Sequence, residues 1–217
     1  MRAIMTLIFV FGLSVAAHAA ETLVGSDNKS YSNSVQIESA TYSGDRYATV
    51  TGRVLMNGTL GGSLVLLSDV NGLPNWIDNL EAVTQVNQRS LTDRQIHLRF
   101  SAPAGLDDRD GLMRFVARSE GSNVVTLNLT GVDGFPEQPN AVRMKDVRGY
   151  FRFEQLRDGA LAVEFRLHYD SSATPVVLAN LSVKHQVEQT LGRMRRLIEG
   201  PLRNASPDGP LARQLGI

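Results

Sequence analysis

The sequence predicts an α+β fold in which a curved antiparallel sheet packs against one long carboxy-terminal helix. Two observations lead to it. Apolar and polar residues alternate through five segments between residues 46 and 169, and a 25-residue segment that ends at residue 199 carries an apolar stripe at helical spacing. Alternation with a period of two is typical of strands that have one face in water and one on a core.

The alternating segments are residues 46–56, 95–101, 125–130, 147–153 and 161–169. Turn sequences at 43–45, 120–122 and 157–159 contain Gly and fit hairpins between antiparallel strands. The apolar positions expected to face the core are Ala48, Val50, Gly52, Val54, Met56, Ile96, Leu98, Phe100, Val125, Leu127, Leu129, Val147, Gly149, Phe151, Phe153, Leu161, Val163, Phe165, Leu167 and Tyr169.

The long helix has clear start and stop signals. Thr174 is a suitable N-cap, Pro175 fits the first helical position, and Gly200 followed by Pro201 ends the helix. Its expected buried stripe is Val176, Ala179, Val183, Val187, Leu191, Met194 and Ile198. A weaker helical pattern covers residues 60–70, where Gly61 and Gly62 each cost about 1 kcal/mol against Ala.

The amino terminus has the pattern of a cleavable export signal. Arg2 precedes an apolar run from Ile4 to Ala17, and Ala17-His18-Ala19 has the spacing that a signal peptidase cleaves. A membrane anchor is the alternative, but about 14 apolar residues fall short of the roughly 20 that span a bilayer. We therefore expect residues 1–19 to be a signal peptide, a mature amino terminus at Ala20, and a periplasmic or secreted protein.

The mature chain is expected to form one soluble domain. Residues 20–34 are rich in Ser, Asn and Gly and predict a flexible leader, 35–199 the domain, and 200–217 a loosely attached tail. The chain has no cysteine, and 22 basic residues stand against 22 acidic ones. This composition excludes thiol chemistry and gives no signal for nucleic-acid binding.

Several short motifs occur in a characteristic order along residues 69–199. They are Asp69, Leu73-Pro74-Asn75-Trp76, Phe100-Ser101-Ala102-Pro103, Asp108-Arg109-Asp110, Val142-Arg143, Gly149-Tyr150-Phe151, Tyr169-Asp170, Pro175, Leu178-Ala179-Asn180 and Thr190 to Arg195. In this order they resemble the START family of StAR-related lipid-transfer domains, within the wider group of birch-pollen-allergen and polyketide-cyclase-like proteins. Two features depart from the family pattern: Gly61-Gly62 in the first helix, and residues 170–173 without glycine.

The resemblance implies a helix-grip fold with an apolar tunnel between the sheet and the carboxy-terminal helix. It implies a lipid, sterol or similar hydrophobic ligand, and no cofactor. The residues expected to line the ligand site are Trp76, Phe100, Arg109, Phe115, Leu127, Arg143, Phe151, Phe165, Val183 and Val187. Val187 is expected to border empty or ligand-filled space. Loops 102–110 and 131–139 contain Gly and Pro and are expected to gate the tunnel.

The charged candidates allow two interpretations. The resemblance puts Arg109 and Asp110 beside the tunnel, where they would either orient the polar head of a ligand or form an ion pair that pins the loop. Arg143 has the same two interpretations. Asp107 and Asp108 cluster with Asp110, and we expect a solvated turn there because the spacing of a calcium loop is missing.

No catalytic or metal-binding motif is found. His97 and His168 fall on the expected wet faces of strands and His185 lies off the helical stripe, so all three are predicted to be surface residues. The sequence has neither H-E-x-x-H nor G-x-S-x-G. We therefore expect neither a catalytic residue nor a metal site, and we expect that the protein is not an enzyme.

The sequence favours an exported lipid-binding or lipid-transport protein whose partner is a hydrophobic small molecule or lipid, with transient membrane contact. Two alternatives remain open. One is a cyclase- or aromatase-like enzyme on the same fold, and the other is a protein-interaction module with a solid core. The expected shortage of titratable groups on the inner strand faces favours the carrier, because acid–base catalysis requires such groups near the substrate.

Overall fold

The computed structural model describes residues 22–102, 106–156 and 159–217. The signal peptide expected at residues 1–19 and three residues of loop 102–110 lie outside this part. No helix in the described ranges is long and apolar enough to cross a bilayer.

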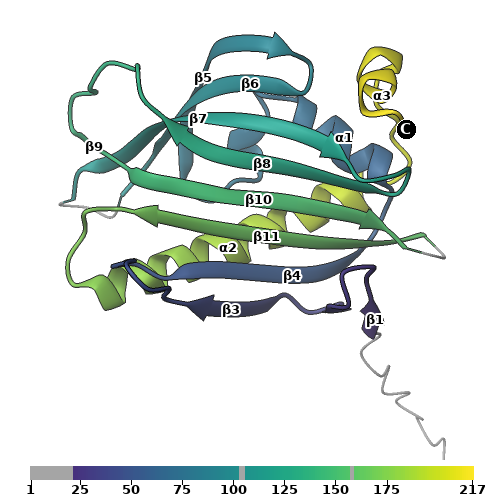
Figure 1. The fold of residues 1–217 in the computed structure, drawn as a ribbon, viewed down its shortest axis with the longest axis horizontal. Coiled ribbons are helices and arrows are strands. Elements are labelled where there is room, and N and C mark those ends of the chain that lie inside the picture. Colours follow the sequence, from purple (N-terminus) through teal and green to yellow (C-terminus); the bar gives the residue numbers. More distant parts are fainter. Residues whose placement is uncertain (1–21, 103–105, 157–158) are drawn as a thin grey trace, which may run out of the picture.

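One strongly curved sheet dominates the molecule (Figure 1). In spatial order its strands are β3 (Gln36–Ala40), β4 (Thr49–Asn57), β11 (Ala160–Asp170), β10 (Lys145–Gln155), β8 (Val124–Val132), β7 (Asp108–Ser119), β6 (Asp93–Phe100) and β5 (Leu80–Ser90). Each of these strands is antiparallel to its neighbours, and the short strand β9 (Ala141–Arg143) pairs with β7 in parallel. The predicted α+β class is confirmed.

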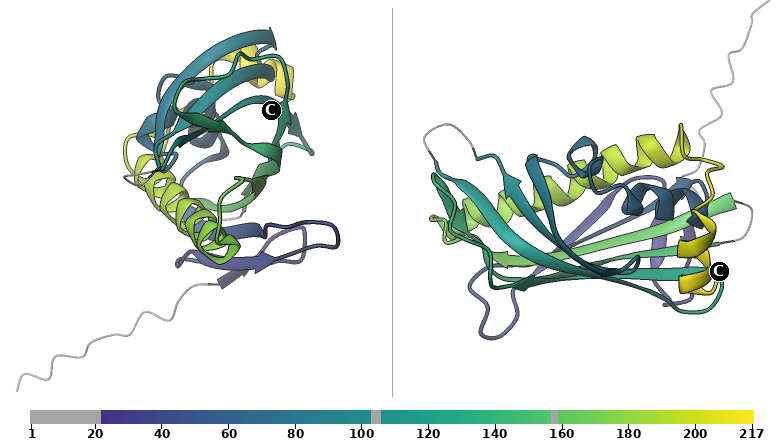
Figure 2. Two further views of the ribbon diagram at one scale, coloured as in Figure 1. Left: turned by 90° about the vertical axis from the view of Figure 1, so that its left-hand side faces the viewer. Right: turned by 90° about the horizontal axis from the view of Figure 1, so that it is seen from above.

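Helix α2 (Val176–Glu199) runs across the open side of the curled sheet, as Figure 2 shows. Six of the seven predicted stripe residues are buried, from Ala179 to Ile198, while Val176 is half-buried. The helix begins one residue later than expected, because Pro175 has extended backbone and is the cap. Its stop at Gly200 is confirmed.

Helix α2 packs closely against the sheet at Gly52 of β4. A Cβ atom added to Gly52 would lie 2.5 Å from Leu191 Cδ1 and 2.7 Å from Val187 Cγ1. The missing side chain therefore lets the helix pack directly on the strand backbone. The inner faces of the central strands are those that the alternation predicted, with Val163 and Phe153 fully buried.

Helix α1 (Leu60–Ser68) and the 3-10 turn η1 (Leu73–Asn75) precede β5. Thr59 caps α1 by accepting a hydrogen bond from the Gly62 amide at 3.0 Å. A Cβ atom on Gly62 would lie 2.2 Å from the Leu202 carbonyl oxygen, and one on Gly61 would lie 2.8 Å from that of Ala205. The glycine pair therefore allows the carboxy-terminal chain to pack against α1.

The carboxy-terminal segment differs from the loose tail that the sequence predicts. It forms helix α3 (Gly209–Leu215), which Asp208 caps and whose Leu211 and Leu215 side chains are buried in the main core. Ser119 of β7 donates a hydrogen bond to the Leu215 carbonyl, and Gln214 Nε2 donates to Thr92 Oγ1 at 3.0 Å. Figure 2 shows α3 at one end of the sheet, near α1.

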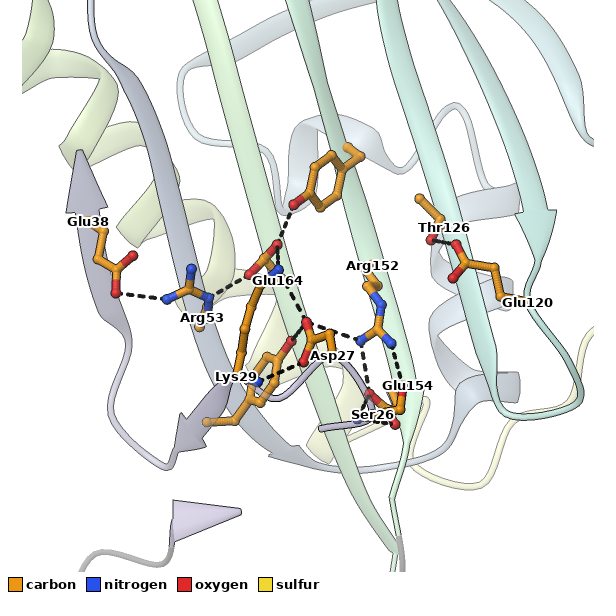
Figure 3. Close-up of polar contacts among 12 residues, drawn as sticks. Ser26, Asp27, Lys29, Glu38, Arg53, Glu120, Thr126, Arg152, Glu154 and Glu164 are labelled. Carbon is orange, nitrogen blue, oxygen red and sulfur yellow. Dashed lines mark hydrogen bonds and ion pairs between the residues drawn. The ribbon is translucent and has the colours of Figure 1, made fainter. Parts of the chain in front are cut away.

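Residues 22–34 also differ from the expected flexible leader. Strands β1 (Thr22–Val24) and β2 (Ser30–Ser32) form a hairpin on the outer face of the sheet, and its Tyr31 is fully buried with Leu55 and Ala162. Buried carboxylates hold the hairpin (Figure 3). Lys29 Nζ lies 2.9 Å from Glu164 Oε1, and the Ser26 amide donates to Glu154 Oε1 at 2.9 Å.

Candidate ligand-binding interior

A small apolar cavity lies between α2 and the middle of the sheet. We call it the central cavity, and its volume is about 40 Å³. Its walls include Leu98, Phe100, Met113, Phe151, Phe165 and Tyr169 from strands β6, β7, β10 and β11. Helix α2 contributes Gln186 and Thr190 to the same cavity.

A second apolar cavity lies toward α3, and we call it the α3-end cavity. Its volume is also about 40 Å³. Leu64 and Leu67 of α1, Trp76, and Leu211 and Leu215 of α3 line it. Ile77, Phe115 and Phe151 border both cavities, so the two are neighbours along one apolar interior.

Aromatic rings fill the space where the cavities meet. The Phe151 ring stacks on Phe165 with centroids 3.9 Å apart, and Trp76 meets Phe151 edge-on at 5.7 Å. Sites for drug-sized ligands have volumes of about 300–1,000 Å³. The interior therefore has the apolar lining expected of a ligand tunnel, but its side chains nearly fill the space.

Six of the ten residues predicted for the ligand site line one of these cavities. They are Trp76, Phe100, Phe115, Leu127, Phe151 and Phe165. Val183 and Val187 are buried but line neither cavity. The expectation that Val187 borders open space is wrong, because it packs against Gly52. A larger side chain at 187 would meet β4, and overpacking there costs roughly 1–3 kcal/mol.

One wall of the central cavity is polar. The Tyr169 hydroxyl donates to Gln186 Oε1 at 3.3 Å, and the Asp78 amide donates to Thr190 Oγ1 at 3.1 Å. Asp78 in turn lies 2.6 Å from Arg193 Nη2. Burial raises the pKa of Tyr169 to about 12, although the positive charge of Arg109 acts in the opposite direction.

Arg94 on the inner face of β6 is a site residue that the sequence analysis missed. Register pairs it with Phe115 of β7, and its side chain lines the α3-end cavity. Its guanidinium donates to the carbonyls of Ser68 at 3.1 Å and Leu91 at 2.8 Å. The alternation of the strand could have identified Arg94, because it lies on the same face as Ile96 and Leu98, two and four residues further along.

The predicted pair Arg109–Asp110 is divided between the two faces of the sheet. Asp110 is buried on the outer face, where Arg143 Nη2 lies 2.9 Å and His97 Nε2 2.8 Å from its Oδ2 atom. Burial opposes ionisation of Asp110, but the hydrogen bonds from Arg143 and His97 outweigh it and lower its pKa. The prediction of a solvated turn is wrong for Asp110.

Arg109 and Arg143 each tie loops together in this structure. Arg143 Nη1 and Nη2 donate to the carbonyls of Phe135 and Pro136, at 3.1 and 3.0 Å. Arg109 Nε donates to the Ser171 carbonyl at 2.9 Å, which joins the start of β7 to the segment before α2. Neither arginine lines the two cavities.

Two of the three histidines predicted to lie at the surface are buried. His97 is 6% exposed because the Phe135 ring stacks on it at 3.9 Å. His168 is 2% exposed, with its Nδ1 atom 3.2 Å from Thr49 Oγ1, and burial followed by the Arg148 charge lowers its pKa. His185 is exposed, as predicted. Within the described ranges no cluster of three His, Cys, Asp or Glu side chains is suited to a metal ion.

No protein-family model matches the chain, and no curated protein is similar to it in sequence. Solved structures are similar in fold. A STAR-related lipid transfer protein from Xanthomonas axonopodis is 19% identical with a TM-score of 0.69, over 82% of this chain and 98% of that one. Human StAR-related lipid transfer protein 5 is 14% identical with a TM-score of 0.67, over 84% and 88%.

Human STARD10 is likewise 14% identical with a TM-score of 0.67, over 77% of this chain and 70% of that one. At such identities the similarity establishes the arrangement of the chain. The START resemblance is thereby confirmed for the fold, and the chain has the helix-grip fold of the StAR-related lipid-transfer domains.

Proposed function

We propose that the protein is an exported carrier that binds an apolar ligand between the sheet and α2. The observation that carries the proposal is the apolar interior, in which two neighbouring cavities are walled by Leu, Ile, Met and aromatic side chains. Neighbours of the same fold named as lipid transfer proteins support it.

A binding role fits the interior better than catalysis does. The titratable groups on the cavity walls are Tyr169 and Arg94. Burial raises the pKa of Tyr169 to about 12, and an arginine side chain stays protonated in proteins. General acid–base catalysis is efficient when a pKa lies near the working pH. These two groups favour holding a ligand over transforming it.

We propose in addition that the end of the molecule at the start of α2 touches membranes. Val177, Leu178 and Leu181 on the first turns of α2 are 69%, 62% and 53% exposed, and Leu106 is 61% exposed. The bond from Arg109 to the Ser171 carbonyl ties these two segments together. Apolar side chains gathered at one exposed end favour shallow contact with a bilayer.

Vesicle sedimentation tests the membrane contact. The triple change Val177→Ser, Leu178→Ser and Leu181→Ser is expected to reduce binding to phosphatidylcholine vesicles at least fivefold. Val86→Ser is the control, because Val86 is an exposed valine on edge strand β5. Equal binding of the triple variant and the parent contradicts this contact.

Native mass spectrometry of the protein purified from its own host, together with titration of the apolar dye 1-N-phenylnaphthylamine, tests ligand binding. Retained apolar mass and saturable dye binding are expected. Leu98→Trp in the central cavity should weaken dye binding about tenfold. Arg118→Trp, on the exposed outer face of β7, should leave it unchanged.

A domain with a solid core gives the opposite result. The small volume of the cavities favours this alternative, which predicts no retained mass and no saturable dye binding. Export is tested separately by the intact mass of the protein recovered outside the cytoplasm. A mass equal to that of a chain beginning at Ala20 supports the proposed signal peptide, and a mass that includes residues 1–19 contradicts it.

A further inference from the structure

An arginine side chain faces an apolar cavity at the α3 end of the molecule. Arg94 is in phase with the buried residues Ile96 and Leu98 of β6, and it lies opposite the buried Phe115. Burial lowers the pKa of Arg94, which is the expected effect of removing a cation from water. An inward cation on a core-facing strand costs stability unless something compensates its charge.

Six of the ten other arginines in the strands of the sheet have such compensation. Carboxylates lie within 4.0 Å of the arginines at 53, 99, 114, 143, 148 and 152. In the described part of the chain no carboxylate lies that close to Arg94. Its two contacts are neutral carbonyls, at the end of α1 and at Leu91. They use two of the five N–H donors of the guanidinium and leave its charge unpaired.

A second donor on the same cavity is also unused. The Trp76 side chain is 1% exposed and forms part of the wall, yet its Nε1 atom has no hydrogen-bond partner among the described residues. A buried donor without an acceptor costs about 1–3 kcal/mol. The rest of the wall is aliphatic or aromatic, apart from Ser68 and Thr92.

We propose that the α3-end cavity binds an amphiphile with one anionic oxygen head, a carboxylate or a phosphate monoester, held by Arg94. This inference rests on the proposed carrier function and specifies its ligand class. Arg94 is partly exposed, so the head lies at the rim while the apolar chain passes Trp76 toward Phe151 and the central cavity. Guanidinium groups bind carboxylate and phosphate oxygens through paired hydrogen bonds.

The chain carries its own reporter for this site, because Trp76 is the only tryptophan. Its fluorescence is titrated with decanoate, decyl phosphate and decan-1-ol, which share one alkyl chain and differ in the head. At low ionic strength we expect at least one anion to bind ten times more tightly than decanol. The stronger of the two anions identifies the head group. Added salt should narrow the difference, since it screens a partly exposed charge pair.

Arg94→Gln removes the charge, and its matched control is Arg118→Gln on the exposed outer face of β7. The Arg94 change should weaken binding of the preferred anion at least tenfold and that of decanol less than twofold. The control should change neither. Arg94→Lys retains a cation and should keep a preference for the anion. The comparison of ligands on the unmodified protein requires no variant to fold.

Three outcomes overturn the inference. The anions bind no more tightly than decanol, the Arg94→Gln change weakens all three ligands equally, or it weakens none. The first of these, with decanol and the dye still bound, leaves the carrier function standing and removes only the anionic head. Absence of binding by all the alkyl ligands and by the dye removes both proposals.

Discussion

The Glu164 carboxylate is buried on the outer face of the sheet between three donors. Lys29 Nζ lies 2.9 Å and Arg53 Nε 2.5 Å from its oxygens, and the Tyr150 hydroxyl donates to it (Figure 3). Burial opposes its ionisation, but the bonds from Lys29, Tyr150 and Arg53 outweigh burial and lower its pKa. The ionised carboxylate therefore stabilises the folded chain, and its pair with Lys29 holds the β1–β2 hairpin against the sheet.

Because the pKa of Glu164 is lower in the folded than in the unfolded chain, its contribution to stability is complete above the ordinary glutamate pKa of 4.5 and is lost as the pH falls through the folded pKa. Glu164→Gln should cost about 2–3 kcal/mol at pH 7, below the roughly 3–5 kcal/mol of a fully buried pair. Glu38→Gln, at a 65% exposed partner of Arg53, should cost under about 1 kcal/mol.

Urea unfolding between pH 3 and 8 measures both effects. The Glu164→Gln variant should lose less stability on acidification than the parent does. Parallel pH profiles for the two proteins would show that this carboxylate does not link protonation to folding.

Single residues also mark where sequence reasoning reaches its limit. The parity of β6 assigned Ile96, Leu98 and Phe100 to the core correctly, and the same parity places Arg94 among them. Parity assigned His97 to water, but the Phe135 ring from another loop covers it. Local alternation predicts which face of the sheet a side chain lies on. Whether that side chain is buried depends on residues distant in sequence that pack over it.

The contact between α2 and β4 depends on one glycine. Gly52→Ala would bring a methyl group to 2.7 Å from Val187 Cγ1, and a β-branched side chain cannot easily turn away. We expect a loss of roughly 1–3 kcal/mol. Gly192→Ala is the matched control, because nothing lies within 4 Å of its added Cβ atom.

The control should stabilise the protein by roughly 0.5–1 kcal/mol, since Gly weakens a helix interior. Urea titration gives both values. A second change, Val187→Ala, should restore part of the stability lost by Gly52→Ala. If the losses of stability from the two changes simply add in the double variant, the strain does not arise from the contact between positions 52 and 187.

Helix α3 closes the outer end of the α3-end cavity with two leucines. Leu215→Ala should cost about 2 kcal/mol, the low end for a buried leucine, and should expose the cavity. Quenching of Trp76 fluorescence by acrylamide should then increase. Leu178→Ala, at a 62% exposed position, should change neither stability nor quenching. Unchanged quenching in the Leu215 variant would contradict a lid role for α3.

At the scale of elements, the central strands and α2 were predictable because burial on one face imposes a period on their sequences. The two ends of the chain were not. The hairpin of residues 22–34 is held by Glu154 and Glu164, more than 120 residues away in sequence. The tail forms α3 because Asp208 caps it and the core accepts its leucines. Polar composition alone does not distinguish a docked segment from a loose one.

The whole molecule combines an apolar interior with very little free volume. A cavity of about 40 Å³ has room for a few water molecules and not for a ten-carbon chain. Binding a lipid-like ligand must therefore separate elements that are in contact. The helix contact at Gly52 is close, whereas α3 rests on two leucines and a few hydrogen bonds, so the α3 end is where we expect opening.

This arrangement predicts that the rate of ligand uptake is limited by opening of the α3 end, and not by the collision of ligand with protein. In stopped-flow mixing with decan-1-ol, the rate of Trp76 fluorescence change should level off as ligand concentration rises, because the closed protein must open first. Leu215→Ala should raise the limiting rate several-fold, since it weakens the closed state at α3. Leu178→Ala should leave that rate unchanged. A rate that rises in proportion to decanol concentration, with no limit and no effect of Leu215→Ala, would show that the interior is open before the ligand arrives.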